Sequence, residues 1–260
     1  MKKLSKDTKF AHLGKPGTIF SKGFQRRLSI ITSIVDFNNK KILDVGCGEG
    51  VWLKQFLKYT SSDNIFGTDI DSESIHKAIE STPEIKSFNL RVSKSENMDF
   101  ADNFFDIVFQ NEVLEHVQDD LQTIKECLRI LKPGGYLILF TPNSGWPFET
   151  HGIFYNGKYY WGNIPLLPWL PKSIQKKYAP HVRNYTNNEI ETIIKKASII
   201  EEKNKLTSKI IYHKHVFSAF DGLERKFGII GKAIKKTVHS LEKTPLHFFG
   251  ISHLLIIQKT

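Results

Sequence analysis

The sequence predicts an α/β fold in which helices cover both faces of a doubly wound, mostly parallel β-sheet. Apolar strand-like segments alternate with amphipathic helix-like segments between residues 20 and 143, as in parallel sheets with right-handed crossovers. The segment FFDIVFQN, residues 104–111, is nearly all apolar apart from Asp106. Such a strand is expected where a sheet is covered on both faces.

Five strands and four helices are expected in the first half of the chain. Apolar residues from Phe20 to Val35 recur at helical spacing. Asp71 or Ser72 can cap the helix after the second strand, and KPGG ends the helix before the fifth. The expected strands are residues 41–46, 64–70, 85–92, 104–111 and 136–143, and the expected helices are residues 20–36, 51–59, 72–80 and 121–131.

The composition changes after Asn143. Residues 144–181 are rich in Trp, Tyr, Pro and Gly, and a loop of that length is usually functional. The later elements are expected to be a helix at 186–198, a strand within 199–217, a basic helix over 221–243 and a last strand within 247–260. The sheet would then have seven strands, with insertions after the fifth strand and before the last one.

We expect a single domain over residues 1–260, with its core at 20–143 and insertions at 144–185 and 205–250. The two cysteines suggest neither a disulfide framework nor a zinc site, and the lysine-rich start has no apolar segment typical of a signal peptide. These features predict a cytoplasmic protein. The net charge of +10 is concentrated at the two ends of the chain, which favours an anionic partner or serves solubility alone.

Asp44 ends the first strand, and glycines follow at every second position in ILDVGCGEG. Gly46, Gly48 and Gly50 let the backbone turn sharply and let a ligand approach the main chain. The G-x-G-x-G spacing differs from that of nicotinamide-binding loops, and a carboxylate here would repel a pyrophosphate. The Asp44 carboxylate instead suits a ligand with a cationic end, such as S-adenosylmethionine. Asp69, at the end of the second strand, can accept both ribose hydroxyls.

Five segments between Ile42 and Asn143 occur in the order ILDVGCGEG, IFGTDID, SKSENMDFADNFFDIV, NEVLEHV and LRILKPGGYLILFTPN. With them the sequence resembles the class I S-adenosylmethionine-dependent methyltransferases. The resemblance implies a Rossmann-like fold, this cofactor and a methyl-transfer reaction. The alternative is a doubly wound domain without the cofactor.

The resemblance also implies which residues bind the cofactor. Gly46 and Gly48 would pack against it, with Gly50 in the same loop. Asp44 would support its amino group directly or through water, and Asp69 would hold the ribose.

Further cofactor contacts are implied on the adenine and methionine sides. Ile70 would lie beside the adenine, as would Ser95 and Glu96 through their backbone groups. Many relatives have an acidic residue where this chain has Lys94, which weakens any assignment for the adenine amino group. Asn111 would lie near the methionine portion.

The segments RLSIITSIV and NEVLEH resemble the O-methyltransferases of ubiquinone biosynthesis more narrowly. Arg27 matches an arginine that reaches the cofactor carboxylate in those enzymes; the alternative is an exposed arginine on an amphipathic helix. Both the ubiquinone enzymes and the small-RNA 2′-O-methyltransferases share the pattern E-x-x-E-H with a later histidine.

This pattern implies a divalent cation such as Mg²⁺ at Glu112, Glu115, His116 and His181. A helix would place the first three on one face, and His151 is a second candidate for the later histidine. The alternative is that these residues pack a helix cap and a loop without metal.

An oxygen acceptor must lose a proton, so a base or a metal is required. His116, His151 and His181 are the candidate catalytic residues. We expect a small-molecule or lipid-type acceptor. The alternatives are an RNA or glycan acceptor and a non-catalytic cofactor-binding interaction protein. The sequence does not predict an oligomeric state.

The expected helix over 221–243 is basic and amphipathic, so an anionic membrane surface is a candidate partner; the alternative is packing on the core or in a dimer. His213 and His215 share one face of an expected strand and can chelate a metal. The interpretation that we favour for them is a surface strand with two polar residues.

Overall fold

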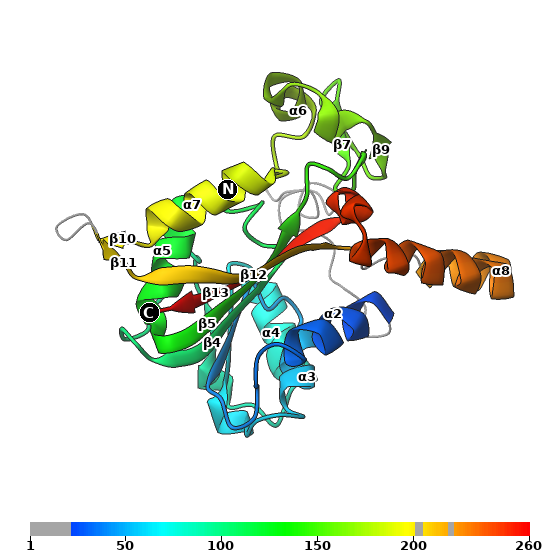
Figure 1. The fold of residues 1–260 in the computed structure, drawn as a ribbon. Coiled ribbons are helices and arrows are strands. Elements are labelled where there is room, and N and C mark those ends of the chain that lie inside the picture. Colours follow the sequence, from blue (N-terminus) through cyan, green and yellow to red (C-terminus); the bar gives the residue numbers. More distant parts are fainter. Residues whose placement is uncertain (1–21, 201–204, 218–220) are drawn as a thin grey trace.

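A computed structural model describes residues 22–200, 205–217 and 221–260, and Figure 1 shows its ribbon. Its centre is one seven-stranded sheet in the order β12-β13-β5-β4-β1-β2-β3. The first five of these strands along the chain are parallel, and β13 runs antiparallel to both neighbours. The predicted fold class is therefore confirmed. The strands are β1 (Ile42–Val45), β2 (Ile65–Asp69), β3 (Leu90–Val92), β4 (Phe105–Asn111), β5 (Leu131–Pro142), β12 (Ser208–Val216) and β13 (Ser252–Lys259).

Helices cover both faces of this sheet (Figure 1). Each face has its own apolar core: Ile31, Trp52 and Ile75 belong to one, and Ile124 and Ile190 to the other. Side chains from both cores are inaccessible to water, which stabilises the sheet from two sides. The first face carries α2 (Lys22–Thr32), α3 (Val51–Phe56) and α4 (Ser72–Ser81), and the second carries α5 (Asp120–Ile130) and α7 (Asn187–Ala197).

The third strand is shorter than its apolar pattern predicts. We expected residues 85–92, but Ser87–Asn89 form a 3-10 turn and the strand begins at Leu90. The buried Asn89 donates a hydrogen bond from Nδ2 to the Ile65 carbonyl, at 3.1 Å. This contact satisfies a buried polar group and fixes the turn against β2.

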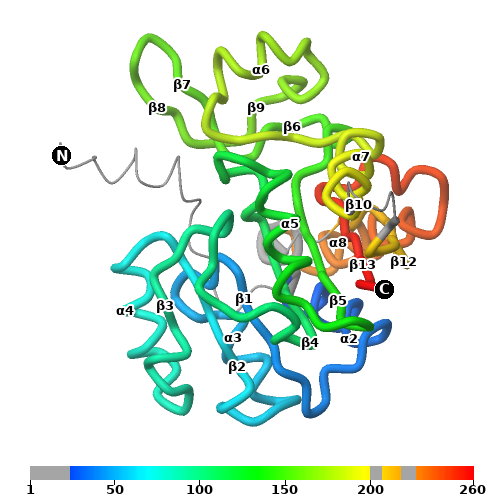
Figure 2. The backbone as a smooth tube through the Cα atoms, turned by 90° about the vertical axis from the view of Figure 1, so that its left-hand side faces the viewer, coloured from blue at the N-terminus to red at the C-terminus, as the bar shows by residue number. Residues whose placement is uncertain are grey.

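The insertion after β5 is a small folded unit rather than an open loop. Two short antiparallel pairs and α6 enclose a cluster of Leu167, Ala179 and Val182. The unit forms a lobe at the top of Figures 1 and 2, next to the carboxyl end of β5 from which it continues. Its elements are β6 (Phe148–Glu149), β7 (Ile153–Tyr155), β8 (Lys158–Tyr160), β9 (Ile164–Pro165), η3 (Leu167–Trp169) and α6 (Lys172–Tyr178), and a separate hairpin joins β10 (Ile199–Ile200) to β11 (Lys205–Leu206).

The expected basic helix is α8 (Asp221–Ser240), which extends away from the body in Figure 1. It is interrupted at Gly228, where φ is 54° and ψ is −126°. Ile229 and Ile230 are 88% and 69% exposed, so this part of the helix does not pack on the core. No helix among the described residues combines the length and apolarity needed to cross a membrane.

Candidate active site at the carboxyl ends of the strands

The glycine loop follows β1 and has the left-handed backbone that its sequence requires. Gly46 has φ of 73°, and a Cβ there would lie 2.3 Å from Cγ2 of Val113. No side chain fits at this position without displacing Val113. Gly48 has φ of 52°, and a Cβ there would meet no atom of the described residues within 4 Å, so this part of the chain leaves open space beside the loop. Gly50 begins α3 with φ of 85°.

Asp44 is buried beneath this loop with only 1% of its surface exposed. Its Oδ2 has no hydrogen-bond partner among the described residues. Burial, and secondarily the nearby Asp69, hold the pKa of Asp44 well above its ordinary value. A buried carboxylate without a partner is costly, and an ammonium group would relieve that cost.

Asp69 ties the second strand to the glycine loop. Its Oδ2 accepts a hydrogen bond from the Gly48 amide and its Oδ1 from the Asp71 amide, both at 2.9 Å. Each oxygen keeps a second lone pair, so the carboxylate can still accept from hydroxyls. Ile70 beside it is 55% exposed and offers an apolar surface at the same edge.

The residues expected near the adenine have different surroundings. Glu96 Oε1 accepts a hydrogen bond from the Gln118 amide at 2.9 Å, so this side chain holds the turn before α5. Ser95 Oγ lies 3.4 Å from Oγ1 of Thr123. Contacts from this segment to a ligand are therefore left mainly to the backbone.

Arg27 reaches from α2 to the same edge of the sheet. It donates to Oδ1 of Asn111 at 2.6 Å and pairs with Oε1 of Glu112 at 2.8 Å. Ser252 at the start of β13 also contacts both Arg27 and Glu112. Burial raises the pKa of Glu112, but Arg27 and Ser252 outweigh it and lower the pKa overall. Arg27 is thus a partly buried cation at the strand ends, not an exposed helix residue.

Glu115, His116 and His151 form a compact group beyond β4 and β5. Oε1 of Glu115 lies 3.9 Å from Nε2 of His116 and 4.0 Å from Nε2 of His151. Glu115 is buried, and this oxygen has no hydrogen-bond partner in the described part of the chain. Burial, followed by the charge of Glu112, holds the pKa of Glu115 well above its ordinary value.

Neighbouring acceptors set the proton positions on both imidazoles. His116 Nδ1 lies 3.1 Å from the His181 carbonyl, and His151 Nδ1 lies 3.0 Å from Oε1 of Glu149. A carbonyl and a carboxylate only accept hydrogen bonds, so each Nδ1 carries the proton and each Nε2 presents a lone pair to Glu115. Burial and the neighbouring His151 lower the pKa of His116 to about 4.

Comparison with known proteins connects this geometry to a family. Residues 43–139 match the family model of the methyltransferase domain. A ubiquinone biosynthesis O-methyltransferase of Bartonella tribocorum is 29% identical over 172 residues, 64% of this chain and 66% of the relative. By this match, residues 43–139 of the chain belong to the methyltransferase domain family.

The curated relatives are matched over less than two thirds of their length. An uncharacterized methyltransferase of Schizosaccharomyces pombe is 35% identical over 105 residues, 37% of this chain and 38% of the relative. Among solved structures, an S-adenosylmethionine-dependent methyltransferase from Mesorhizobium loti has a TM-score of 0.61 at 12% identity, covering 93% of this chain and 100% of the other. That likeness shows the fold alone.

One sequence expectation about the E-x-x-E-H segment is wrong. Residues 112–116 form a turn rather than a helix, and Glu112 has a left-handed φ of 56°. Glu112 is therefore directed to Arg27 and Ser252. His181 also differs from its expected place, because its Nε2 lies 3.1 Å from the His151 carbonyl and donates to it. The close group is Glu115 with His116 and His151.

Sequence reasoning missed the residues that orient His151. Glu149 is buried, and its Oε1 accepts from both the backbone amide and Nδ1 of His151. Its other oxygen accepts from Nδ2 of Asn184 at 2.6 Å. The only sequence signal was the short spacing within the segment ETH, which is not specific.

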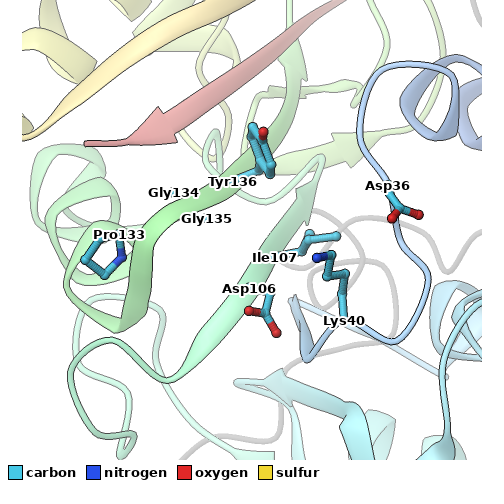
Figure 3. A pocket seen from close by; sticks show the side chains of 8 residues that line it. All are labelled: Asp36, Lys40, Asp106, Ile107, Pro133, Gly134, Gly135 and Tyr136. Carbon is cyan, nitrogen blue, oxygen red and sulfur yellow. The ribbon is translucent and has the colours of Figure 1, made fainter.

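A pocket of about 210 Å³ lies at the opposite edge of the sheet, where the parallel strands begin (Figure 3). Asp106 at this edge accepts from the Lys41 amide and from Nζ of Lys132, both at 2.8 Å. These contacts tie β1 and β5 to β4. Ligands of doubly wound sheets bind at the carboxyl ends of the strands, so we assign this pocket no part in methyl transfer.

Proposed function

We propose that the chain is an active methyltransferase that transfers a methyl group from S-adenosylmethionine to an oxygen of a small-molecule or lipid-type acceptor. The observation that carries the proposal is the group of Glu115, His116 and His151 at the same strand ends as Asp44. Together they support a site with a carboxylate that can bind a cation and with groups that can act on an acceptor proton.

The residues of the glycine loop fit the cofactor. The unsatisfied oxygen of Asp44 suits the ammonium group, and the open space beside Gly48 leaves room for a ligand against the backbone. Asp69 would accept from the ribose hydroxyls, and Arg27 would support the carboxylate. The cofactor supplies the methyl group on a sulfonium, so the protein mainly aligns acceptor and methyl.

The acceptor side supports oxygen as the methylated atom. A hydroxyl must lose its proton as it is methylated, and the Nε2 lone pairs of His116 and His151 are placed to accept one. The carboxylate and two imidazoles also suit a divalent cation such as Mg²⁺, Mn²⁺ or Zn²⁺. When bound, such a cation would lower the pKa of the acceptor hydroxyl. The donor set fits because Glu115 Oε1 and both Nε2 atoms converge.

The lipid-type acceptor is supported by two further features. The ubiquinone biosynthesis O-methyltransferases are among the curated relatives. The exposed isoleucines of α8 lie close in sequence to Lys232 and Lys236, an arrangement that suits an anionic membrane surface. An RNA or glycan acceptor remains the alternative. It would be supported if methylated product formed only with an oligonucleotide or a glycan.

An acceptor screen with isotope-labelled cofactor, read by mass spectrometry, tests the proposal. The label should appear on an oxygen of a phenolic, catecholic or lipid-type compound. Glu115→Gln should remove turnover while S-adenosylhomocysteine binding persists. His76→Ala on the exposed surface of α4 serves as the matched control. If the protein binds S-adenosylhomocysteine but methylates no class of acceptor, the proposal is wrong and a non-catalytic interaction protein is the better interpretation.

A further inference from the structure

A second histidine group lies outside the proposed active site. His213 and His215 stand two residues apart on β12, and His253 is the residue paired with His215 on β13. One ring nitrogen of each lies within 4.8 Å of the other two. His215 is only 1% exposed and His253 is fully buried. The expectation of a surface strand with two polar residues is therefore wrong.

Residues of α7 orient the two histidines of β12. Nδ1 of His213 lies 2.7 Å from Oε1 of Glu191, and Nε2 of His215 lies 2.7 Å from Oδ1 of Asn187. The two α7 residues are four apart, so they lie on one face of the helix. Because both acceptors are oxygens, these ring nitrogens carry the protons. The opposite nitrogens, His213 Nε2 and His215 Nδ1, present lone pairs.

His253 is oriented in the same way by the backbone. Its Nε2 lies 2.8 Å from the Tyr185 carbonyl and donates to it, so its Nδ1 presents a lone pair. That Nδ1 lies 3.0 Å from Nε2 of His213. A fourth ring is close, since Nδ1 of His215 lies 3.2 Å from Nδ1 of His247 on η5 (Pro245–Phe249).

Converging lone pairs repel one another unless a cation lies among them. A shared proton could bridge the His213–His253 pair but could not serve His215 as well. A metal ion at the centre would satisfy every lone pair together.

We propose that this group binds Zn²⁺ through one ring nitrogen each of His213, His215 and His253, with the free Nε2 of His213 and the free Nδ1 of His215 and His253 as the ligand atoms. Tetrahedral Zn²⁺ at about 2.0–2.1 Å from nitrogen separates its ligand atoms by about 3.3 Å. The observed separation of 3.0 Å between His213 Nε2 and His253 Nδ1 is near that value. Imidazole ligands favour zinc and similar metals over magnesium.

The hydrogen-bond acceptors around the three imidazoles supply the outer contacts that such a zinc site needs. Metal-ligating histidines almost always donate their other N–H to a carboxylate, a backbone carbonyl or water. Here Glu191 accepts from His213, and the Tyr185 carbonyl accepts from His253. The ion would join β12 to β13 beneath α7, and its role would be structural. The inference does not depend on the proposed methyl transfer.

Zinc binding by the full chain tests the proposal. The measurement is equilibrium dialysis of metal-depleted protein against Zn²⁺, followed by elemental analysis, in a Glu115→Gln background that removes the other candidate group. This protein should retain one zinc per chain and show a higher Tm with zinc. Adding His213→Ala and His215→Ala should abolish the bound zinc, whereas adding His76→Ala should not.

A milder variant guards against loss of folding. Glu191 is about half exposed, so Glu191→Gln should fold normally and keep S-adenosylhomocysteine binding, yet its zinc affinity should fall about 10–100-fold. Folded Glu115→Gln protein without zinc, or unchanged zinc affinity in both the histidine and Glu191 variants, would overturn the proposal.

Discussion

On the cofactor side of the site, Asp44, Gly46 and Gly48 lie within five residues of one another, and Asp69 ends the adjacent strand. On the proposed acceptor side, Glu149 and His151 are close in sequence, but Glu115 and Asn184 come from distant segments and meet them only in the fold. The first arrangement uses backbone geometry and single side chains that face a ligand. The second uses chains of hydrogen bonds in which one side chain orients the next.

This difference has a consequence for mutations. On the cofactor side each residue would act on the ligand directly, so its loss should appear in cofactor affinity. On the acceptor side, removal of Glu149 or Asn184 should leave cofactor affinity intact and lower turnover, because only the orientation of a histidine changes. Binding and catalysis should therefore separate experimentally between the two sides.

The largest effect is expected for Gly46→Ala. The new Cβ would clash with Val113 and occupy a left-handed backbone, which together should lower the free energy of unfolding by about 2–4 kcal/mol. S-adenosylhomocysteine affinity, measured by calorimetry, should fall on the order of 100-fold because the loop must move. Gly157→Ala is the matched control, since Gly157 has the same φ of 73° but a Cβ there would meet no atom within 4 Å in the part of the chain that the structure describes. Equal losses of stability and of S-adenosylhomocysteine affinity in both variants would show that the left-handed backbone, and not the contact with Val113, causes the effect.

Asp44→Asn should separate affinity from stability. Losing the carboxylate should weaken S-adenosylhomocysteine about 10–100-fold, as expected for a hydrogen bond to a charged group. Because the pKa of Asp44 is raised in the folded protein, the folded state holds its proton more tightly than the unfolded chain. Stability without ligand should therefore fall as pH rises above about 4. The variant has no ionisable group at this position, so it should not show the loss of stability that ionisation of Asp44 causes.

Chemical denaturation at several pH values checks this second expectation. The cofactor-free variant should be more stable than the wild type at pH 7, because it no longer buries an unpaired carboxylate. A variant that is less stable at every pH, with unchanged affinity for S-adenosylhomocysteine, would argue that Asp44 has a structural role only.

Glu149→Gln should sharpen the contrast from the acceptor side. The charge that orients His151 is lost, so turnover with an identified acceptor should fall about 10–100-fold, as for other orienting carboxylates. The Kd of S-adenosylhomocysteine should stay the same. Glu73→Gln, on the exposed face of α4, is the control. A parallel loss of cofactor affinity would mean that the two sides are coupled after all.

The same contrast explains what the sequence could predict. The existence of the strands and helices and the glycine loop follow from local periodicity and spacing, which single segments carry. The left-handed turn at Glu112 does not, because glutamate rarely adopts that φ and its contacts with Arg27 and Ser252 come from distant segments. An E-x-x-E-H pattern therefore suggested a helix face that does not form.

The histidine group on β12 and β13 was less predictable still. His253 lies in the apolar segment ISHLLIIQ, where its spacing to His213 carries no signal. Only the antiparallel pairing of β12 with β13 places it opposite His215. Likewise, Glu149 could not be recognised without knowing that His151 points back toward Glu115.

The smallest effect is expected far from both sides, on α8. If its exposed isoleucines enter the headgroup region, Ile230→Ser and Ile234→Ser should each weaken binding to anionic vesicles by about 1 kcal/mol, roughly fivefold in partition coefficient. Co-sedimentation at low salt measures this. Ile211→Ser on β12 is the matched control, because Ile211 and Ile234 are each 42% exposed. Cofactor affinity should not change in any of the three. If the control lowers sedimentation as much as the α8 variants, or if neutral vesicles pellet the protein equally, α8 has no specific membrane role and its apolar face must meet another protein surface.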